Sequence, residues 1–146
     1  MNFRYLIQKI RRFVLRILSI KTAKRIEMVD ITGDVRTIIR EEGFVDGLCH
    51  LFVPHTTAAL TINENADPAV CRDILNHLSR LVPPSSPYDH REGNADAHIK
   101  SSLVGPSETL IVEGGRLVLG TWQALFFCEF DGPRERKVFV KLLPKG

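Results

Sequence analysis

The sequence predicts a single domain of the α+β class, and three observations support this prediction. Its 146 residues, of which 44% are hydrophobic and 25% charged, suit one globular domain with a modest core. A long amphipathic helix is indicated near the middle of the chain, over residues 68–82. Short stretches with strand periodicity precede and follow it, and no repeat or linker divides them. We therefore expect one domain over residues 12–146, preceded by a basic extension over residues 1–11.

The amino-terminal half is expected to contain strands and one short helix. Alternating or continuous apolar residues predict strands over residues 12–19, 25–31, 48–53 and 58–62. Between the second and third of these, a short helix is expected to begin at Thr32, with Val35, Ile38 and Ile39 on one face. Gly43 is expected to end it.

The helix over residues 68–82 has clear start and stop signals. Asp67 is a natural N-cap, and Pro68 suits the first helical position, where the missing N–H leaves no hydrogen bond unmade. Pro83 and Pro84 end the helix. Its apolar stripe consists of Val70, Cys71, Ile74, Leu75, Leu78 and Leu81. His77 lies away from this stripe and is expected at the surface.

The carboxyl-terminal half is expected to be a β-meander. Two apolar runs, 110–113 and 116–119, flank Gly114 and Gly115, which is the pattern of a hairpin. Strands over residues 123–130 and 137–143 are expected to follow. Residues 83–97 form one long irregular segment, and such segments in compact domains are commonly functional.

Charge and targeting signals limit the possible partners. The net charge is +3, and much of the basic excess falls in the first 25 residues, so we expect no nucleic-acid partner. The first 20 residues contain no uncharged run long enough for a signal peptide or a membrane helix, which favours a cytoplasmic protein. Residues 3–14 could form a basic amphipathic helix that touches an anionic membrane. Packing against the protein's own domain or a neighbouring subunit is the favoured interpretation.

The three cysteines predict neither a disulfide framework nor a metal ribbon. Cys49, Cys71 and Cys128 form no CxxC pair, and their number is odd. Each is surrounded by apolar residues, so we expect buried, reduced thiols.

A histidine-rich loop is the first candidate for chemistry. Residues 90–98 read HREGNADAH, which brings His90, His98, Glu92 and Asp96 into nine positions. Imidazole nitrogen and carboxylate oxygen suit zinc or a similar divalent ion, and His55 could join them. A solvated loop whose histidines cap turns is the alternative.

A second group of polar residues surrounds the strand expected over residues 58–62. Because Pro54 interrupts the preceding strand, His55 should lie at a strand end and point into a cleft. The hydroxyl groups of Thr56 and Thr57 could donate to an oxyanion or phosphate. Asn63 and Glu64 come just before the long helix; the asparagine could simply build the turn, which leaves the glutamate unexplained.

Three further sites are candidates for substrate contact. Lys100 and Ser101 could hold an anion near the ion, or could form the hydrophilic side of a short helix or strand. Trp122 and Gln123 offer an indole and an amide donor, although a tryptophan can equally anchor the core. Glu129 lies in a strongly apolar strand, where burial would require a cation. Arg134 or Arg136 could supply that cation, and such a structural pairing is the favoured interpretation.

Taken in order, these motifs resemble the YjbQ-like family, also called UPF0047. The resemblance covers roughly residues 15–143 and rests on residues 55–60, 63–68, 88–90, 94–102, 120–123 and 129–134. It implies an α+β fold with an antiparallel β-sandwich or barrel-like core, assembled as a homotrimer. It also implies a metal-bearing pocket near the subunit interface, to which His55, His90 and His98 would contribute. Family members have been associated with a weak, secondary thiamine-phosphate synthase activity.

The residues are compatible with more than one reaction of this kind. Joining a pyrimidine diphosphate to a thiazole phosphate displaces pyrophosphate, and a divalent ion with Lys100, Arg134 and hydroxyl groups could neutralise its charge. Zinc is the expected metal, with Mg²⁺ the alternative for diphosphate chemistry. Hydrolysis of a phosphoester or amide, with Glu64 or Glu129 as general base, is a rival. A third possibility is a trimeric binding module with a structural metal.

Overall fold

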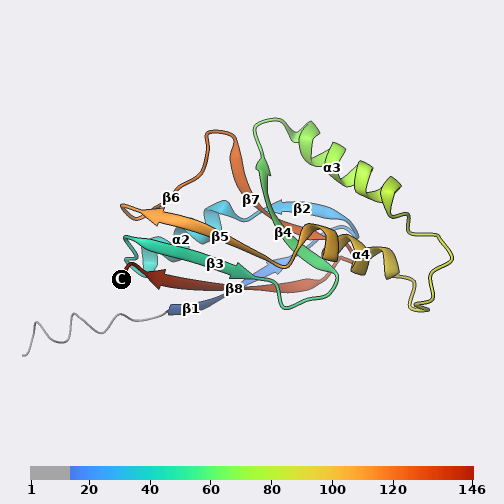
Figure 1. Cartoon of the computed structure of the whole chain (residues 1–146), viewed down its shortest axis with the longest axis horizontal. Helices are drawn as coiled ribbons and strands as arrows, with labels where there is room; N and C mark the ends of the chain where they lie inside the picture. Colours follow the sequence, from blue (N-terminus) through green and yellow to red (C-terminus); the bar gives the residue numbers. More distant parts are fainter. Residues whose placement is uncertain (1–13) are drawn as a thin grey trace, which may run out of the picture.

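The structure is a computed structural model that describes residues 14–146 (Figure 1). The basic extension expected over residues 1–11 lies outside this range. So does the amphipathic helix expected over residues 3–14, apart from Val14, which begins the first strand. Within the described chain, no helix is both long enough and apolar enough to span a bilayer.

Two antiparallel sheets form the framework of the domain. The large sheet has the strand order β1 (Val14–Lys21), β8 (Glu135–Pro144), β3 (Gly47–Phe52), β5 (Ser107–Glu113) and β6 (Arg116–Leu117). The small sheet has the order β2 (Glu27–Asp30), β7 (Gln123–Glu129) and β4 (Ala58–Glu64). The predicted hairpin of β5 and β6 is confirmed, with Val112 opposite Leu117.

The predicted carboxyl-terminal meander is wrong. After β6, the chain crosses to the small sheet, where β7 pairs with both β2 and β4. It then returns to the large sheet, where β8 lies between β1 and β3. The last two strands thus connect the sheets instead of extending one of them, because their apolar residues are buried against strands from the amino-terminal half.

Three helices within residues 14–146 accompany the sheets, and the long one begins as predicted. In α3 (Pro68–Leu81), the Asp67 carboxylate accepts a hydrogen bond of 2.8 Å from the amide of Ala69. The short helix α2 (Thr32–Glu41) buries Val35, Ile38 and Ile39, also as predicted. The third helix, α4 (Ala95–Val104), begins inside the segment expected to be irregular through residue 97.

The main core lies between the two sheets and is closed by α2. Its buried side chains come from the inner faces of both sheets and from α2, among them Leu51, Leu60, Phe127, Val140 and Ile39. A second, smaller core covers the other face of the small sheet, where Ala59, Cys128 and Phe130 pack against residues of α3 and α4. In Figure 1, α3 and α4 lie on the opposite side of the small sheet from α2.

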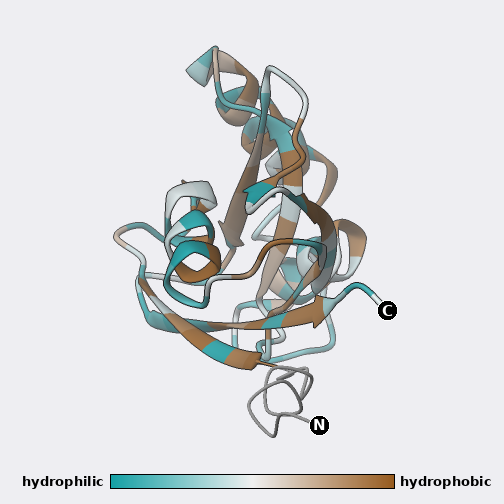
Figure 2. Cartoon of the chain, turned by 90° about the vertical axis from the view of Figure 1, so that its left-hand side faces the viewer, coloured by the Kyte–Doolittle hydropathy of each residue, from teal (hydrophilic) through white to brown (hydrophobic). Residues whose placement is uncertain are grey.

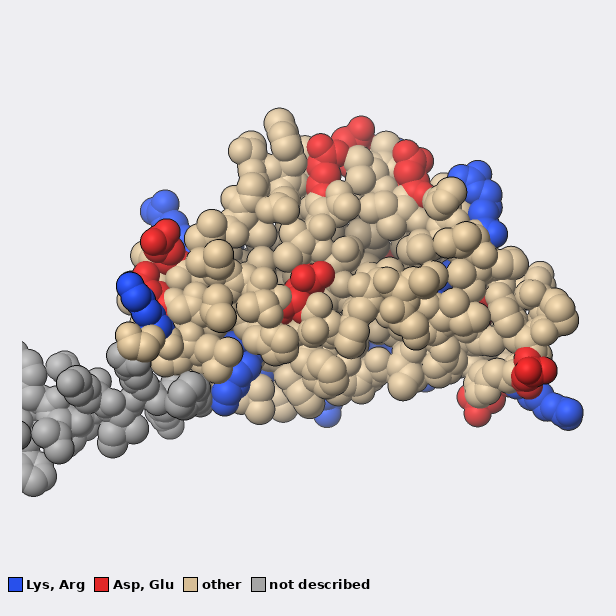
Figure 3. All heavy atoms as spheres, in the orientation of Figure 1, with Lys and Arg blue, Asp and Glu red and all other residues tan. Residues whose placement is uncertain are grey.

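The outer face of the large sheet carries apolar side chains that nothing in the described chain covers. Ile17 is 57% exposed and Ile111 is 56% exposed. Strand pairing places Leu15, Ile17, Leu48, Phe52, Ile111 and Phe139 on the same face, with His50, Thr109 and Lys141 between them. Figure 2 shows hydrophobic and hydrophilic residues alternating along the strands, and Figure 3 shows few charged side chains in the middle of the face that it presents. This face therefore resembles an interaction surface.

Candidate functional site

The predicted site residues gather at two opposite ends of the β4–β7 pair. At one end, Ala58 is opposite Glu129; at the other, Glu64 is opposite Gln123. Six residues of strand separate these ends, which corresponds to about 20 Å. We call the first the ion-pair end and the second the open end. Figure 1 shows the open end next to the start of α3 and the ion-pair end next to β8 and α4.

Glu129 and Arg136 form a buried ion pair at the ion-pair end. Arg136 donates from Nε and Nη2 to the two carboxylate oxygens, over 2.8 and 2.5 Å. The hydroxyl of Thr22 and the amide of Asp131 also donate to this carboxylate. Burial by itself would raise the pKa of Glu129, but the hydrogen bond from Arg136 and the weaker ones from Asp131 and Thr22 bring it below the ordinary value. The predicted pairing of Glu129 with an arginine is confirmed for Arg136.

His55 and Thr57 face the same arginine and the start of β8. Arg136 donates from Nη2 to the Thr57 hydroxyl over 2.8 Å, and Thr57 is buried. The Nε2 atom of His55 accepts a hydrogen bond of 2.9 Å from the amide of Lys137. Partial burial, followed by the positive charge of Arg136, lowers the pKa of His55. This change favours the neutral ring, whose Nε2 atom can accept the hydrogen bond from Lys137. Thr56 is exposed.

Helix α4 places a second charged group inside the protein. Asp96 and Lys100 are both 0% exposed, and Lys100 Nζ donates to Asp96 over 3.0 Å. Arg25 donates to both oxygens of the same carboxylate over 3.1 and 3.3 Å. Burial acts to raise the pKa of Asp96, but the bonds from Arg25 and Lys100 lower it overall. Lys100 and the buried Ser101, which donates to the Ala97 carbonyl, therefore face the interior instead of solvent.

The start of α4 is tied to the loop after β7 through Asn94. Its Nδ2 atom donates to Asp131 over 2.9 Å, and Arg134 holds the same Asp131 oxygen over 2.8 Å. The other amide atom, Asn94 Oδ1, is buried and has no hydrogen-bond partner, the one such side-chain atom within residues 14–146. An unpaired buried acceptor is costly unless a donor or a cation satisfies it.

His90 and His98 lie near this unsatisfied oxygen along the chain. Their rings meet edge to face with centroids 5.3 Å apart. Together with Tyr88, Ala95 and Ile99, they line a shallow hollow of about 350 Å³. His98 lies four residues after Asn94, the N-cap residue of α4, and the His98 amide donates to the Asn94 carbonyl over 3.3 Å.

The three histidines do not form a complete site for a divalent ion within one subunit. Within residues 14–146, no group of three or more histidine, cysteine, aspartate or glutamate side chains is arranged to hold a metal. His90 and His98 are paired, whereas the His55 ring points to the start of β8. The described chain thus provides two neighbouring imidazoles and, at the N-cap of α4, an unpaired amide oxygen, and a tetrahedral zinc site would need further ligands.

Gly132 is a site residue that sequence reasoning missed. A Cβ atom at this position would lie 2.4 Å from the Lys24 carbonyl oxygen and 2.8 Å from Glu129 Cγ. Only glycine permits this approach of the loop to the buried ion pair. The Gly132 amide also donates to the Arg25 carbonyl over 2.9 Å, which fixes the loop beside β2.

At the open end, polar groups line a hollow of about 500 Å³. Its walls come from the start of α2, the residues after β4 and the turn before β7, and its lining includes Asp30, Arg36, Asn65, Thr121 and Gln123. Asn65 bonds to Asp30 over 2.8 Å, and its amide bonds to the Trp122 carbonyl.

The predicted residues of the open end make few contacts. Asn63 is exposed, and its side chain accepts only from the amide of Glu64. Trp122 is 61% exposed, so the core-anchor interpretation is wrong. Gln123 accepts a bond of 2.8 Å from the Gly120 amide. The open end is therefore built from accessible groups with little internal pairing.

Comparisons with known proteins agree with this architecture. The family model of UPF0047 protein YjbQ-like matches residues 16–145. The UPF0047 protein MJ1081 of Methanocaldococcus jannaschii is 56% identical over 86% of this chain and 91% of its own length. The UPF0047 protein YugU of Bacillus subtilis is 51% identical over 89% and 99%. The chain belongs to the YjbQ-like UPF0047 family.

Solved structures of the family share the fold. A crystal structure from Clostridium acetobutylicum, described as an uncharacterized protein of this family, has a TM-score of 0.85 and 52% identity, covering 88% of this chain and 99% of that one. A YjbQ-like protein of unknown function from Sulfolobus solfataricus has a TM-score of 0.87 and 36% identity, with coverage of 92% and 99%. The α+β, YjbQ-like fold expected from the sequence is confirmed.

The cysteine thiols of this YjbQ-like chain are buried or partly buried. Cys49 and Cys128 are buried and Cys71 is partly buried, and all three are free. Burial raises the pKa of Cys49 and of Cys128 to about 12, so neither is a thiolate near neutral pH. The expectation of reduced, inert thiols is consistent with this placement.

Proposed function

We propose that this YjbQ-like protein binds a divalent metal and a phosphorylated small molecule at a site that neighbouring subunits complete, and that it acts as a secondary thiamine-phosphate synthase. The observation that carries the proposal is the contact between the His90 and His98 rings, in the same segment of chain as the unpaired Asn94 oxygen. His90 and His98 would supply two zinc ligands, with Mg²⁺ as the alternative ion for a diphosphate. A third imidazole would come from His55 of the partner subunit.

The separation of the two ends supports a composite site. Each subunit has a charged, internally paired end and an open end with accessible donors, about 20 Å apart along β4. In a ring of identical subunits, different surfaces of neighbouring subunits face each other, so His55 of one subunit could approach His90 and His98 of the next while the open end contributes contacts to the substrate. The uncovered apolar face of the large sheet offers a surface for such assembly, and the homotrimer is the state we propose.

Some residues of the chain would hold the site in place, and others would contact the substrate. The pair of Glu129 with Arg136 fixes the loop that carries Asp131 and Arg134, and Arg134 is accessible to a phosphate. Thr56, Asn63, Trp122 and Gln123 are exposed and can contact substrate. Lys100 acts through Asp96 instead of contacting an anion directly. When bound, the metal would neutralise negative charge on the departing pyrophosphate.

Hydrolysis of a phosphoester is a second candidate, favoured by one specific observation. Glu64 is partly exposed at the open end, and its carboxylate has no ion pair within residues 14–146. This side chain is therefore available as a general base, whereas the Glu129 carboxylate is occupied by four donors. A Glu64→Gln variant would lose hydrolysis under this alternative and keep most synthase activity under the first.

Subunit mixing tests the composite metal site. We expect His55→Ala and His98→Ala each to lose metal by elemental analysis, with the fold intact, whereas His77→Ala on the surface of α3 keeps it. Mixed oligomers formed by refolding the two deficient chains together should regain metal, because some interfaces then combine an intact His55 with an intact His98. Metal retained in either single variant would contradict the ligand assignment, and no recovery on mixing would contradict the shared site.

Activity is tested separately on the metal-loaded protein. Incubation with a pyrimidine diphosphate and a thiazole phosphate should give thiamine phosphate and pyrophosphate, and the His98→Ala variant should give neither. Hydrolysis of p-nitrophenyl phosphate without any synthase product would favour the hydrolase. Absence of both activities in a fully loaded trimer would leave the protein as a binding module with a structural metal.

A further inference from the structure

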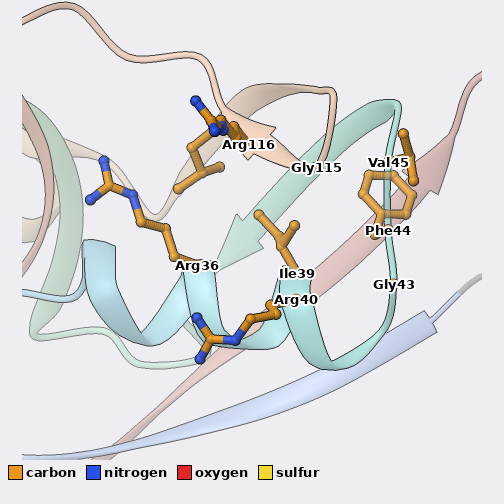
Figure 4. A pocket seen from close by; sticks show the side chains of 9 residues that line it. Arg36, Ile39, Arg40, Gly43, Phe44, Val45, Gly115 and Arg116 are labelled. Carbon is orange, nitrogen blue, oxygen red and sulfur yellow. The ribbon is translucent and has the colours of Figure 1, made fainter.

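A second pocket beside α2 is distinct from the proposed metal site and shares only Arg36 with the hollow at the open end. It lies between the end of α2, the turn that follows it and the β5–β6 hairpin, and its volume is about 550 Å³ (Figure 4). This volume is in the range of small-molecule sites. None of the residues in the proposed metal site lines it.

The end of α2 shapes one wall of this pocket. Gly43 adopts a φ of 59°, and its amide bonds to the Arg40 carbonyl while the Phe44 amide bonds to the Ile39 carbonyl. This is the Schellman arrangement, in which the residue after the glycine packs back onto the helix. Ile39 and Phe44 therefore form a fixed apolar wall instead of a loose turn.

The hairpin forms the opposite wall and is anchored to the same turn. The Gly115 amide bonds to the Val45 carbonyl over 2.9 Å, and the Gly114 amide bonds to Asp46 over 3.1 Å. Leu117 is buried beneath, while Arg116 is exposed. Both walls are thus held by backbone hydrogen bonds, so the pocket is formed before any ligand arrives.

Three arginines surround this apolar pocket, and none of them is held in an ion pair within the described residues. Arg36, Arg40 and Arg116 line it, and in the chain from residue 14 onward none of them makes an ion pair. Arg40 bonds only to the Thr37 hydroxyl. The neighbouring carboxylates, Glu41 and Glu42, are already held by Arg16 over 2.9 and 2.6 Å. Arg36 is close enough to Asp30 to lower its pKa, and Glu113 lies opposite Arg116 in the hairpin, but in the described chain neither carboxylate forms an ion pair with these arginines. Their guanidinium groups therefore keep donors that a ligand can use.

The charged and apolar groups are arranged at different ends. In Figure 4, Arg36 and Arg116 lie toward one end, Phe44 and Val45 lie at the other, and Ile39 lies between them. Guanidinium groups bind phosphate and carboxylate oxygens in a fixed fork geometry. The apolar end would accommodate a ring or a short hydrocarbon.

We propose that this pocket binds a small organic oxyanion. The ligand carries a phosphate or carboxylate group and one apolar group about as large as a phenyl ring. Arg36 and Arg116 bind the oxyanion, and Ile39, Phe44 and Leu117 cover the apolar group. The basic amino-terminal residues of the same chain are a poor occupant because like charges would repel. The proposal goes beyond the synthase function and does not depend on it.

Titration by two-dimensional amide NMR with phenyl phosphate tests this site in the full chain. We expect shifts concentrated at Gly43, Phe44, Val45, Gly115 and Arg116. Phenol lacks the oxyanion that the arginines bind, and inorganic phosphate lacks the ring that the apolar end covers. Each should therefore bind at least about tenfold more weakly than phenyl phosphate. Binding of phenol as tight as that of phenyl phosphate would overturn the role of the arginines.

Variants separate the two halves of the pocket. Arg116→Gln should weaken phenyl phosphate binding by about tenfold, the usual loss of a charge-assisted hydrogen bond. Val45→Asp, at an exposed position, should weaken it further by placing a negative charge at the apolar end. Arg80→Gln on the surface of α3 is the matched control and should change nothing. Equal affinity in Arg116→Gln and Arg80→Gln, or shifts that map elsewhere, would overturn the proposal.

Discussion

The two ends of the β4–β7 pair are built on opposite principles. At the ion-pair end, Glu129, Arg136, Asp96 and Lys100 are buried, and each charge has at least one charged partner. At the open end, Asn63, Trp122 and Gln123 are exposed and make local contacts or none. The same ladder of strands thus joins a preorganised end, where changes should affect folding, to an accessible end, where changes should affect binding.

The largest effect is expected from breaking the buried ion pair. Replacing Arg136 with Met would leave the Glu129 carboxylate buried with only Thr22 and the Asp131 amide as donors. Such a loss destabilises proteins by about 3–5 kcal/mol. Urea unfolding monitored by circular dichroism would measure the change in the free energy of unfolding.

Two further variants make this prediction specific. The double variant Glu129→Leu with Arg136→Met should recover much of the loss, because an apolar pair of similar size is often tolerated. Arg134→Ala breaks the pair with Asp131, in which the arginine side chain is 54% exposed, and should cost below about 1 kcal/mol. If Arg136→Met and Arg134→Ala were equally stable, the contrast between buried and exposed pairs would be wrong.

The second prediction concerns the triad of Arg25, Asp96 and Lys100. Asp96→Ala would leave the fully buried Lys100 ammonium without its partner, at a cost of about 3 kcal/mol. Lys100→Met should cost less, because Asp96 keeps both bonds from Arg25 and methionine fills the volume. Urea unfolding of the two variants should give the lower midpoint for Asp96→Ala. A lower midpoint for Lys100→Met would mean that Lys100 has another essential partner.

Much of the secondary structure could be predicted from the sequence because its signals are local. The cap at Asp67, the apolar face of α2 and the two glycines of the hairpin are each encoded within a few residues. Helix α4 was missed because it buries Asp96, Lys100 and Ser101, so no apolar stripe marks its inner face. Asn94 before it and Gly105 after it were the available signals.

The sheet arrangement and the division of the site could not be predicted in this way. Whether β7 pairs with β2 and β4 or with β6 depends on contacts between residues about 60 to 100 positions apart, which local periodicity does not contain. The same pairing sets Glu64 and Glu129 at opposite ends of the ladder. The arginine partner of Glu129 was foreseeable, because a carboxylate in an apolar strand requires a buried cation.

The third prediction is that the free energy of unfolding falls at acid pH because the buried carboxylates of the ion-pair end become protonated. Glu129 and Asp96 have lowered pKa values in the folded protein, so the unfolded chain binds protons first as the pH falls. Their contribution is complete above the ordinary values of 4.5 and 3.8, and it is lost as the pH falls through the lower folded values. Urea midpoints measured from about pH 6 down to about pH 3 should fall less steeply in the Glu129→Leu, Arg136→Met double variant than in the parent. Parallel curves would show that this pair does not cause the fall.

The smallest effect on folding is expected at the open end. Because Trp122 is 61% exposed, Trp122→Ala should change the free energy of unfolding by no more than about 0.5 kcal/mol. As the only tryptophan, Trp122 also provides a fluorescence signal from this end alone. If a neighbouring subunit or a phosphorylated substrate covers the open end, emission should shift to shorter wavelength on assembly or on addition of a thiazole phosphate. Emission typical of a hydrated indole in every state, with unchanged oligomer size in Trp122→Ala, would mean that this end is accessible surface only and that the binding site must be sought at the ion-pair end.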